Sequence, residues 1–310
     1  MSASSAQPPA QPLQEVERFG GNPGNLRMYL YKPPALPRGA PLVVLVHGCT
    51  ATARETGVQS GWLRLADEHR FAVLLPETSR ANEPLGGCFR TWEPEHQARG
   101  AGEPLSIRQM IAYAQKHDHL SKRHVFITGM SSGGHVVNVM LAAYPDLFAA
   151  GAPLASFPYK CALKLSDLRP CATGEVRRTP TEWGALVRGA YPGFHGRRPR
   201  VQIWHGDEDP LINVAGQARQ AAQWRNVLGL AEPGVEGMRA GLPVVRYANP
   251  KTGAVVETVT VPGMGHAMPV DPGPAKGQCG ETGPYASDVG VCAAFWIGRF
   301  FGIIPEERRR

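Results

Sequence analysis

The 310-residue sequence contains no long hydrophobic run. No apolar stretch approaches the roughly 20 residues that a helix needs to cross a membrane, so we predict no membrane partner. No apolar segment follows Met1, which leaves either a cytoplasmic protein or a mature chain whose leader has been removed. Internal repeats and a convincing domain boundary are also missing, which predicts a single folded domain.

Acidic residues are in the minority. Lys and Arg number 33 against 26 Asp and Glu, which gives a formal net charge of +7 at pH 7. Arginines cluster at residues 177–178, 197–200 and 308–310, and such clusters can attract an anionic surface or nucleic acid. Because no interleaved aromatic residues and no nucleic-acid motif accompany them, we interpret the clusters as solvated surface and predict no nucleic-acid partner.

The C-x-x-C spacing of many zinc sites is missing as well. His117, His119 and His124 lack the spacing of a metal site, so we predict no metal and no cofactor. The six cysteines are an even number in loop-like settings, which favours disulfides, and hence a secreted or periplasmic protein, over six reduced thiols. The sequence alone permits about 15 full pairings. The cysteines fall into three neighbourhoods, Cys49 with Cys88, Cys161 with Cys171, and Cys279 with Cys292.

Strand-like and helix-like segments alternate along the chain. Apolar runs, typical of strands in a parallel sheet, lie at 42–46, 71–75, 125–127 and 149–155, and residues 201–204 are predicted to form a further strand. Helix-like segments lie at 61–70, 105–117, 215–228 and 285–301. The alternation predicts an α/β protein with a mostly parallel central sheet and helices on both faces.

Three parts of the chain differ in composition. Residues 1–24 are rich in Ser, Ala, Pro and Gln and are predicted to form a flexible amino-terminal tail. Residues 25–304 are predicted to form one α/β domain. Within it, residues 157–200 are irregular, and we expect this insertion to cap a site at the carboxyl edge of the sheet.

One turn carries the strongest chemical signal. Gly129, Ser131 and Gly133 form a G-x-S-x-G pattern between an apolar strand and a helix-like run. In that setting the pattern predicts a nucleophile elbow, with Ser131 on a strained turn at the amino end of the helix. The two glycines are expected to be small because a side chain at either position would collide with neighbouring segments. The alternative is an ordinary Gly/Ser turn.

Two further strand ends supply an acid and a base. A serine hydroxyl is a poor nucleophile until a base removes its proton, and the base needs an acid to hold its tautomer. Ser131, Asp209 and His266 follow one another in the Ser…Asp…His order of α/β-hydrolases. Asp207 is the alternative acid, although the strand-end position favours Asp209.

An oxyanion formed at the serine needs two N–H donors. We expect one donor from Ser132, the residue after the nucleophile, and the other from Cys49 or Thr50, which follow the first buried strand. His47 and His205 also lie at strand ends before a glycine. We interpret both as side chains that brace their loops by hydrogen bonds.

These stretches together resemble a known family. The matching segments include residues 46–53, 61–71, 105–110, 128–134, 204–209 and 263–272. They are similar to the poly(3-hydroxybutyrate) depolymerase-like esterases, an α/β-hydrolase family that also resembles feruloyl and acetylxylan esterases. The resemblance implies Ser131 as nucleophile, Asp209 as acid, His266 as base, and the backbone of Cys49 and Ser132 as oxyanion hole. It also supports pairing Cys161 with Cys171 and is compatible with a Cys49–Cys88 bridge.

The resemblance also implies a function. We expect a serine carboxylesterase that hydrolyses a polyhydroxyalkanoate-type polyester or its oligomers, acting as a monomer on a polymeric or oligomeric ester. Feruloyl or acetylxylan esterase activity on plant polysaccharide, or acyl transfer on the same fold, are the alternatives.

One loop departs from the family pattern. The family has Cys-Phe-Asn-Trp-Phe-Glu-Pro where this chain has the run from Cys88 to Pro94, with Trp92 displaced by one position. We expect Phe89, Trp92 and Phe157 to be exposed and to bind substrate. Trp92 and the insertion 157–200 are then expected to decide the substrate.

Overall fold

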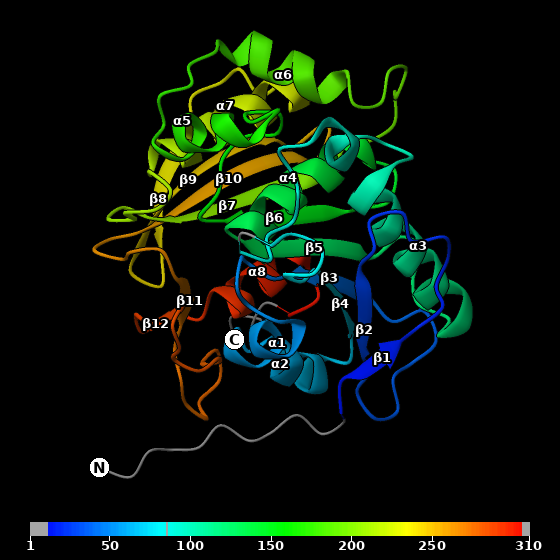
Figure 1. Ribbon diagram of the computed structural model, residues 1–310. Helices are drawn as coiled ribbons and strands as arrows, with labels where there is room; N and C mark the ends of the chain where they lie inside the picture. The colour runs from blue at the N-terminus through cyan, green and yellow to red at the C-terminus, as the bar shows by residue number, and fades with distance from the viewer. Residues whose placement is uncertain (1–11, 85, 306–310) are drawn as a thin grey trace.

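The computed structural model describes residues 12–84 and 86–305, which fold around a ten-stranded sheet with helices on both faces (Figure 1). The six central strands run parallel, and two antiparallel strands extend the sheet at each side. In spatial order the strands are β1 (Gln14–Val16), β2 (Arg27–Tyr31), β4 (Ala72–Glu77), β3 (Leu42–Val46), β5 (Val125–Met130), β6 (Ala150–Leu154), β7 (Arg200–Gly206), β10 (Ala254–Val261), β9 (Leu242–Asn249) and β8 (Val235–Arg239).

The sheet divides the hydrophobic core into two layers, one on each face, and helices cover both layers. The helices α3 (Gly102–His117), α4 (Ser132–Ala143) and α7 (Ala215–Leu228) pack on one face of the sheet. The helices α1 (Ala53–Gln59), α2 (Trp62–His69) and α8 (Ala293–Phe301) pack on the other. The central strands are apolar because both of their faces are covered, and every residue of β3 is buried. The sheet therefore confirms the predicted α/β architecture.

Shorter elements complete the chain. The 3-10 turns Pro94–Gln97 and Leu165–Asp167 lie in the two long irregular regions, and α5 (Leu168–Ala172) and α6 (Pro180–Arg188) lie between β6 and β7. A separate two-stranded parallel sheet pairs β11 (Met268–Val270) with β12 (Ala286–Asp288). Figure 1 shows this small sheet beside α1 and α2, below the carboxyl ends of β7 and β10 in that view.

Part of the segment predicted as a flexible amino-terminal tail packs on the folded domain. Residues 1–11 lie outside the described part of the chain, but β1 pairs antiparallel with β2, and Val16 and Phe19 join the core. The Gly24 N–H donates to Ser106 Oγ at 2.8 Å and ties this segment to α3. Residues 14–24 therefore belong to the fold. The sequence did not indicate this because Val16 and Phe19 are the few apolar residues in a polar segment.

Each of the three cysteine neighbourhoods forms one disulfide. They are Cys49–Cys88, Cys161–Cys171 and Cys279–Cys292. The structure thus confirms the two pairings that the resemblance implied.

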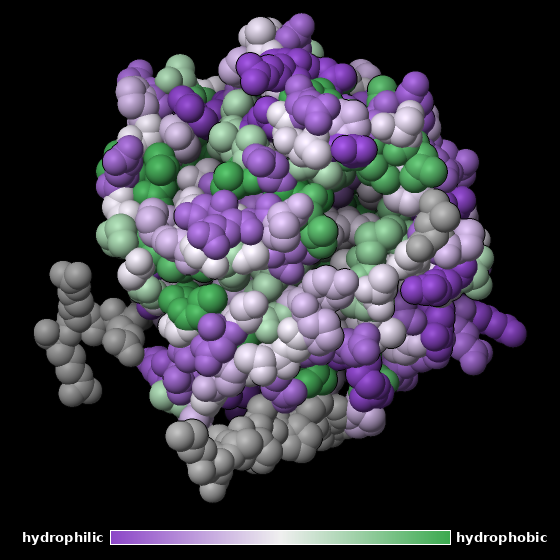
Figure 2. Space-filling view, turned by 60° about the vertical axis from the view of Figure 1, so that its left-hand side comes forward, coloured by the Kyte–Doolittle hydropathy of each residue, from purple (hydrophilic) through white to green (hydrophobic). Residues whose placement is uncertain are grey.

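No helix in residues 12–84 and 86–305 is long and apolar enough to cross a membrane. On the face shown in Figure 2, hydrophobic side chains are exposed in separate small patches between hydrophilic ones.

Candidate active site

The turn between β5 and α4 holds Ser131 in an unusual conformation. Ser131 has φ 57° and ψ −121°, a combination that residues with a Cβ rarely adopt. Its N–H donates to the Leu154 carbonyl at 3.0 Å, which fixes the turn to β6. A Cβ on Gly129 would lie 2.6 Å from the Val46 carbonyl oxygen, and one on Gly133 would also overlap that oxygen. Both glycines are therefore required for β3 to approach the turn.

Asp209 and His266 meet at the ends of β7 and β10. His266 Nδ1 lies 2.7 Å from Asp209 Oδ2, while Asp209 Oδ1 accepts the N–H groups of Leu211 and Ile212 at 2.9 Å each. The Asp209 side chain is fully buried. The loop backbone thus orients the carboxylate, and the carboxylate orients the imidazole.

The carboxyl group of Asp209 has a depressed pKa. Burial alone would raise this pKa, but hydrogen bonds from His205, His266 and the Ile212 N–H outweigh burial and hold the pKa below its usual range. Asp209 is therefore ionised at neutral pH. Asp207, the alternative acid, is exposed and accepts the Gly263 N–H at 2.7 Å, so it braces the loop instead.

The two other strand-end histidines brace their loops as expected. His47 Nε2 accepts the Thr78 N–H at 3.1 Å, and its Nδ1 lies 2.6 Å from the Gly48 carbonyl oxygen. His205 Nε2 lies 2.8 Å from the Ile212 carbonyl oxygen and 3.4 Å from Asp209 Oδ2. Since a carbonyl oxygen only accepts, His205 Nε2 carries a proton and points it at the acid loop. The sequence did not indicate this contact with Asp209.

A pocket of about 200 Å³ opens beside Ser131 and His266. Most of its wall is apolar, and the wall comes from residues 48–60, the elbow, the loop after β7 and the β11–β12 region. Leu211 and Tyr285 also line it and are 57% and 42% exposed. The Tyr285 ring stands edge-on to the His266 ring at 6.4 Å. This pocket suits a small apolar acyl group next to the serine.

The backbone around the serine offers two candidate oxyanion donors. Thr50 is excluded because its N–H already donates to the Gly86 carbonyl at 2.8 Å. Cys49 lines the pocket, and its N–H forms no hydrogen bond with residues 12–84 or 86–305. Ser132 is the first residue of α4, where helix N–H groups lack an intrahelical partner. The geometry leaves the Cys49 and Ser132 N–H groups for an oxyanion.

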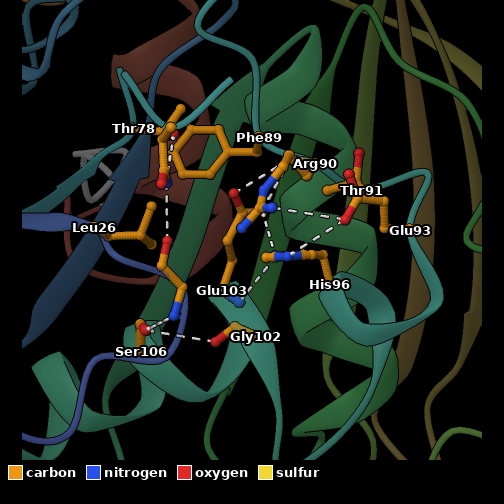
Figure 3. Close-up of polar contacts among 12 residues, drawn as sticks. Leu26, Thr78, Phe89, Arg90, Thr91, Glu93, His96, Gly102, Glu103 and Ser106 are labelled. Atoms are coloured by element: carbon orange, nitrogen blue, oxygen red, sulfur yellow. Dashed lines mark hydrogen bonds and ion pairs between the residues drawn. The ribbon is translucent and has the colours of Figure 1, made fainter. Parts of the chain in front are cut away.

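The loop from Cys88 to Gly102 is fastened behind these donors. The Phe89 N–H donates to Ser132 Oγ at 2.9 Å, and the next N–H, of Arg90, donates to the Glu103 carboxylate at 3.0 Å. Figure 3 shows Glu103 between Arg90 and His96, and His96 Nδ1 lies 3.5 Å from Glu103 Oε2. Through Cys88 the same loop is bonded to Cys49. The loop thus couples both oxyanion candidates to α3.

Glu103 was not predicted from the sequence. The only signal is an acidic residue at the amino end of a helix, which usually stays in solvent. Here it is 1% exposed, because the loop folds over it and supplies backbone N–H groups to its carboxylate.

The three aromatic residues expected to bind substrate do not line the pocket. Phe89, Trp92 and Phe157 are 0%, 8% and 7% exposed. Phe89 packs on the His47 ring, Phe157 packs on the His135 ring, and Trp92 joins a buried cluster around Cys161. The expected exposure was wrong because the Cys49–Cys88 disulfide and Glu103 draw the loop of Phe89 and Trp92 inward, while Phe157 packs on His135 after β6.

The insertion 157–200 does not wall the pocket either. None of the pocket residues comes from it, and its helix α6 packs against α7. The pocket wall is instead formed by residues 48–60 and 266–286, apart from the elbow and the loop after β7. These segments carry the short helix α1, short strands and loops without clear periodicity, so no pattern in the sequence favours them.

Buried histidines predict acid sensitivity of the fold. Burial lowers the pKa of His135 from 6.5 to about 3, with a small opposing effect of the Pro158 carbonyl, and burial also lowers the pKa of His47. The folded state excludes protons that the unfolded state binds, so stability is complete above about pH 6.5 and falls with acidification towards pH 3. We expect His135 to lower the free energy of unfolding by about 1.4 kcal/mol per pH unit below pH 6.5, and His47 to act in the same direction.

Urea unfolding between pH 7 and about pH 5 measures this slope. Asp209 and the other carboxylates with depressed pKa values lose their contribution only at lower pH, so this window isolates the histidines. The variant His135→Gln should have the shallower slope, whatever its stability at pH 7. An equal slope in the variant and the parent would contradict the assignment.

Parallel strands that end on a serine elbow and on a buried Asp–His pair are the arrangement of the α/β-hydrolase fold. With an apolar pocket at the serine, they define the class of serine ester hydrolases. Residues 26–232 match the family described as Esterase PHB depolymerase. The chain belongs to that family and is a serine carboxylesterase.

Individual relatives agree with this assignment. The chain is 42% identical over 293 residues to poly(3-hydroxyalkanoate) depolymerase C of Paucimonas lemoignei, and the match covers 94% of this chain and 70% of that protein. It is 32% identical over 272 residues to acetylxylan esterase A of Aspergillus oryzae, covering 85% and 86% of the two chains. The solved acetyl xylan esterase from Aspergillus awamori superposes with a TM-score of 0.79 at 26% identity and covers 94% of this chain and 100% of that one.

Proposed function

We propose that this protein hydrolyses the ester bonds of a polyhydroxyalkanoate-type polyester or its oligomers, with Ser131 as nucleophile. The observation that carries the mechanism is the 2.7 Å contact of Asp209 with His266 on a pocket that Ser131 also lines. The substrate class is supported by the 42% identity to a poly(3-hydroxyalkanoate) depolymerase and by the apolar pocket wall.

The first half-reaction forms an acyl-enzyme. Asp209 accepts a hydrogen bond from the Nδ1–H group of His266 and stays ionised, which leaves the unprotonated Nε2 to take the hydroxyl proton of Ser131. The serine oxygen attacks the ester carbonyl carbon, and the carbonyl electron pair moves to oxygen. The N–H groups of Cys49 and Ser132 stabilise this oxyanion. The intermediate collapses when the C–O bond breaks and His266 returns the proton to the departing alcohol.

The second half-reaction releases the acid. Water enters in place of the alcohol and gives a proton to His266 as it attacks the acyl carbon. The serine oxygen then leaves with that proton, so the enzyme is restored and one ester bond has become an alcohol and a carboxylic acid. No redox step and no external reactant besides water is required.

Acetylxylan esterase activity is the second candidate. The superposition on the acetyl xylan esterase structure favours it, and the pocket of about 200 Å³ also accommodates an acetyl group. The substrates of the two candidate functions differ in the polarity of the alcohol part of the ester. Leu211 and Tyr285 present exposed apolar surface at the pocket mouth, which suits an apolar polyester chain better than a hydrated sugar chain.

The decisive experiment compares three substrates with one enzyme preparation. We expect clearing of a poly(3-hydroxybutyrate) suspension with release of hydroxy acids, and slower release of acetate from acetylated xylan and of ferulate from methyl ferulate. The Ser131→Ala protein is the blank for each assay. Acetate release without any clearing of the polyester would replace the first candidate by the second.

A variant pair tests the role of the mouth. Leu211→Ala should slow polyester clearing about threefold to tenfold, because one exposed apolar contact is lost, and should leave p-nitrophenyl acetate hydrolysis nearly unchanged. The matched control is Leu165→Ala, since Leu165 is similarly exposed and does not line the pocket. Equal effects of the two variants on clearing would count against a polyester contact at Leu211.

We further propose that the enzyme acts as a monomer in an oxidising compartment, either secreted or periplasmic. The three disulfides support this location. Mass spectrometry of protein isolated from its producing cells, with and without reductant, should count three bridges, and light scattering should give the mass of one chain.

A further inference from the structure

A second pocket lies at the opposite edge of the sheet from Ser131. It has a volume of about 540 Å³ and is formed where β5, β6 and β7 begin. Ser131 follows the carboxyl end of β5, whose six residues span about 20 Å. A ligand in this second pocket therefore cannot reach the serine.

Positive charge dominates the wall of this pocket. The lining includes five cationic side chains from two distant segments, namely Lys122, Arg123, Arg197, Arg198 and Arg200. The one acidic residue in the described lining, Asp146, is already engaged by Arg99 through contacts of 2.7 and 3.0 Å. The chain thus assembles five cations around one hollow without a free carboxylate in the described lining.

Two of the arginines are partly withdrawn from water. Nη1 of Arg198 is buried and has no hydrogen-bond partner among the described residues, and its guanidinium lies 5.3 Å from the Phe194 ring centre. Burial, and next the charge of Arg188, lowers the pKa of Arg198. Burial lowers the pKa of Arg200 too, with further lowering by Arg197 and Arg246. Because Nη1 and Nη2 of Arg200 already donate to the Phe300 and Phe301 carbonyl oxygens, Arg200 adds charge to the pocket and Arg198 adds the unpaired donor. An unpaired buried donor beside like charges is unfavourable until an anion binds.

We propose that this basic pocket, defined by Lys122, Arg123, Arg197, Arg198 and Arg200, binds a small multivalent oxyanion of the oligophosphate class. Guanidinium groups match phosphate oxygens in paired hydrogen bonds, and lysine adds a point charge. The pocket lies in the size range of ligand sites of about 300–1,000 Å³, so it holds more than one phosphate group. The proposal goes beyond ester hydrolysis and does not depend on it.

Calorimetric titration with sodium tripolyphosphate tests the proposal on the intact protein. At constant ionic strength we expect saturable binding of one molecule per chain and a rise of a few degrees in Tm at saturation. Binding should leave the rate of p-nitrophenyl butyrate hydrolysis unchanged, because the two pockets lie at opposite edges of the sheet.

Two variants separate a built site from general attraction to a cationic protein. The double variant Lys122→Gln/Arg123→Gln changes two exposed side chains, so it should fold normally and weaken binding at least tenfold. Arg198→Gln should weaken binding similarly. The matched control Arg177→Gln removes one exposed charge outside the pocket and should bind tripolyphosphate like the parent.

Three outcomes would overturn the proposal. They are the absence of saturable binding, equal affinities in the parent and in the double variant, and competition between tripolyphosphate and the ester substrate. Binding of a twelve-nucleotide single strand without binding of tripolyphosphate would likewise assign the charge to a strand-binding surface instead.

Discussion

Replacement of Ser131 by alanine should lower kcat for p-nitrophenyl butyrate by about 10⁵-fold or more, because the variant has no oxygen that can form the acyl-enzyme. The fold should persist, since the change removes one atom at a pocket wall and leaves the strained turn held by Leu154. Circular dichroism and thermal unfolding would establish the fold, and a stopped assay at high enzyme concentration would measure the residual rate.

The neighbouring serine supplies the matched control. The proposed role of Ser132 is that its backbone N–H stabilises the oxyanion, while its Oγ only accepts a hydrogen bond from the Phe89 N–H. Ser132→Ala keeps the backbone donor, so its kcat should fall by no more than about tenfold. If the Ser132 variant were the inactive one and the Ser131 variant retained full activity, the nucleophile would be misassigned.

Replacement of Asp209 by asparagine should have the second largest effect, about 10⁴-fold in kcat. The Leu211 and Ile212 N–H groups would hold the oxygen of the new amide in the place of Oδ1, so the amide nitrogen would face His266. An NH₂ group there donates to Nδ1 and forces the proton of His266 onto Nε2. That nitrogen then cannot accept the proton of Ser131.

The Asp209→Asn change should also lower the stability of the protein. His205 Nε2 also directs a proton at Asp209 Oδ2, so the amide would place two donors face to face. The Asp209→Asn protein should therefore have a lower Tm as well as a lower kcat. Asp207→Asn, two residues away on the exposed loop, should keep kcat within about threefold of the parent. Comparable losses in both variants would contradict the assignment of the acid.

Local patterns explain why much of the fold and part of the site could be predicted. The central strands are continuous apolar runs because helices cover both faces, and β3 is such a run. The elbow could be found because Gly129, Ser131 and Gly133 form a pattern within one short turn, although the contact that requires the two glycines comes from Val46 of β3. The order of Ser131, Asp209 and His266 follows from the strand ends to which they belong.

Contacts between distant segments account for what could not be predicted. Phe89 and Trp92 lie in a loop whose aromatic composition is typical of a binding loop. The Cys49–Cys88 disulfide and the carboxylate of Glu103 hold this loop with both side chains buried. The pocket wall after His266 lacks periodicity, and so does the short strand β1. The basic pocket joins residues about 75 positions apart, so the cluster at 197–200 was interpreted by itself as solvated surface, and Lys122 and Arg123 were not singled out.

The backbone angles of Ser131 imply that this chain is less stable than its fold permits. A residue with a Cβ held at φ 57° and ψ −121° costs roughly 1–3 kcal/mol, and a glycine there would avoid most of that strain. Ser131→Gly should therefore unfold at a higher temperature than the active enzyme, although glycine also loosens the unfolded chain; an unchanged or lower Tm would argue against stored strain. With Ser131 as the proposed nucleophile, activity and thermal robustness oppose each other at a single residue, and any gain in robustness that keeps the activity must come from elsewhere in the chain.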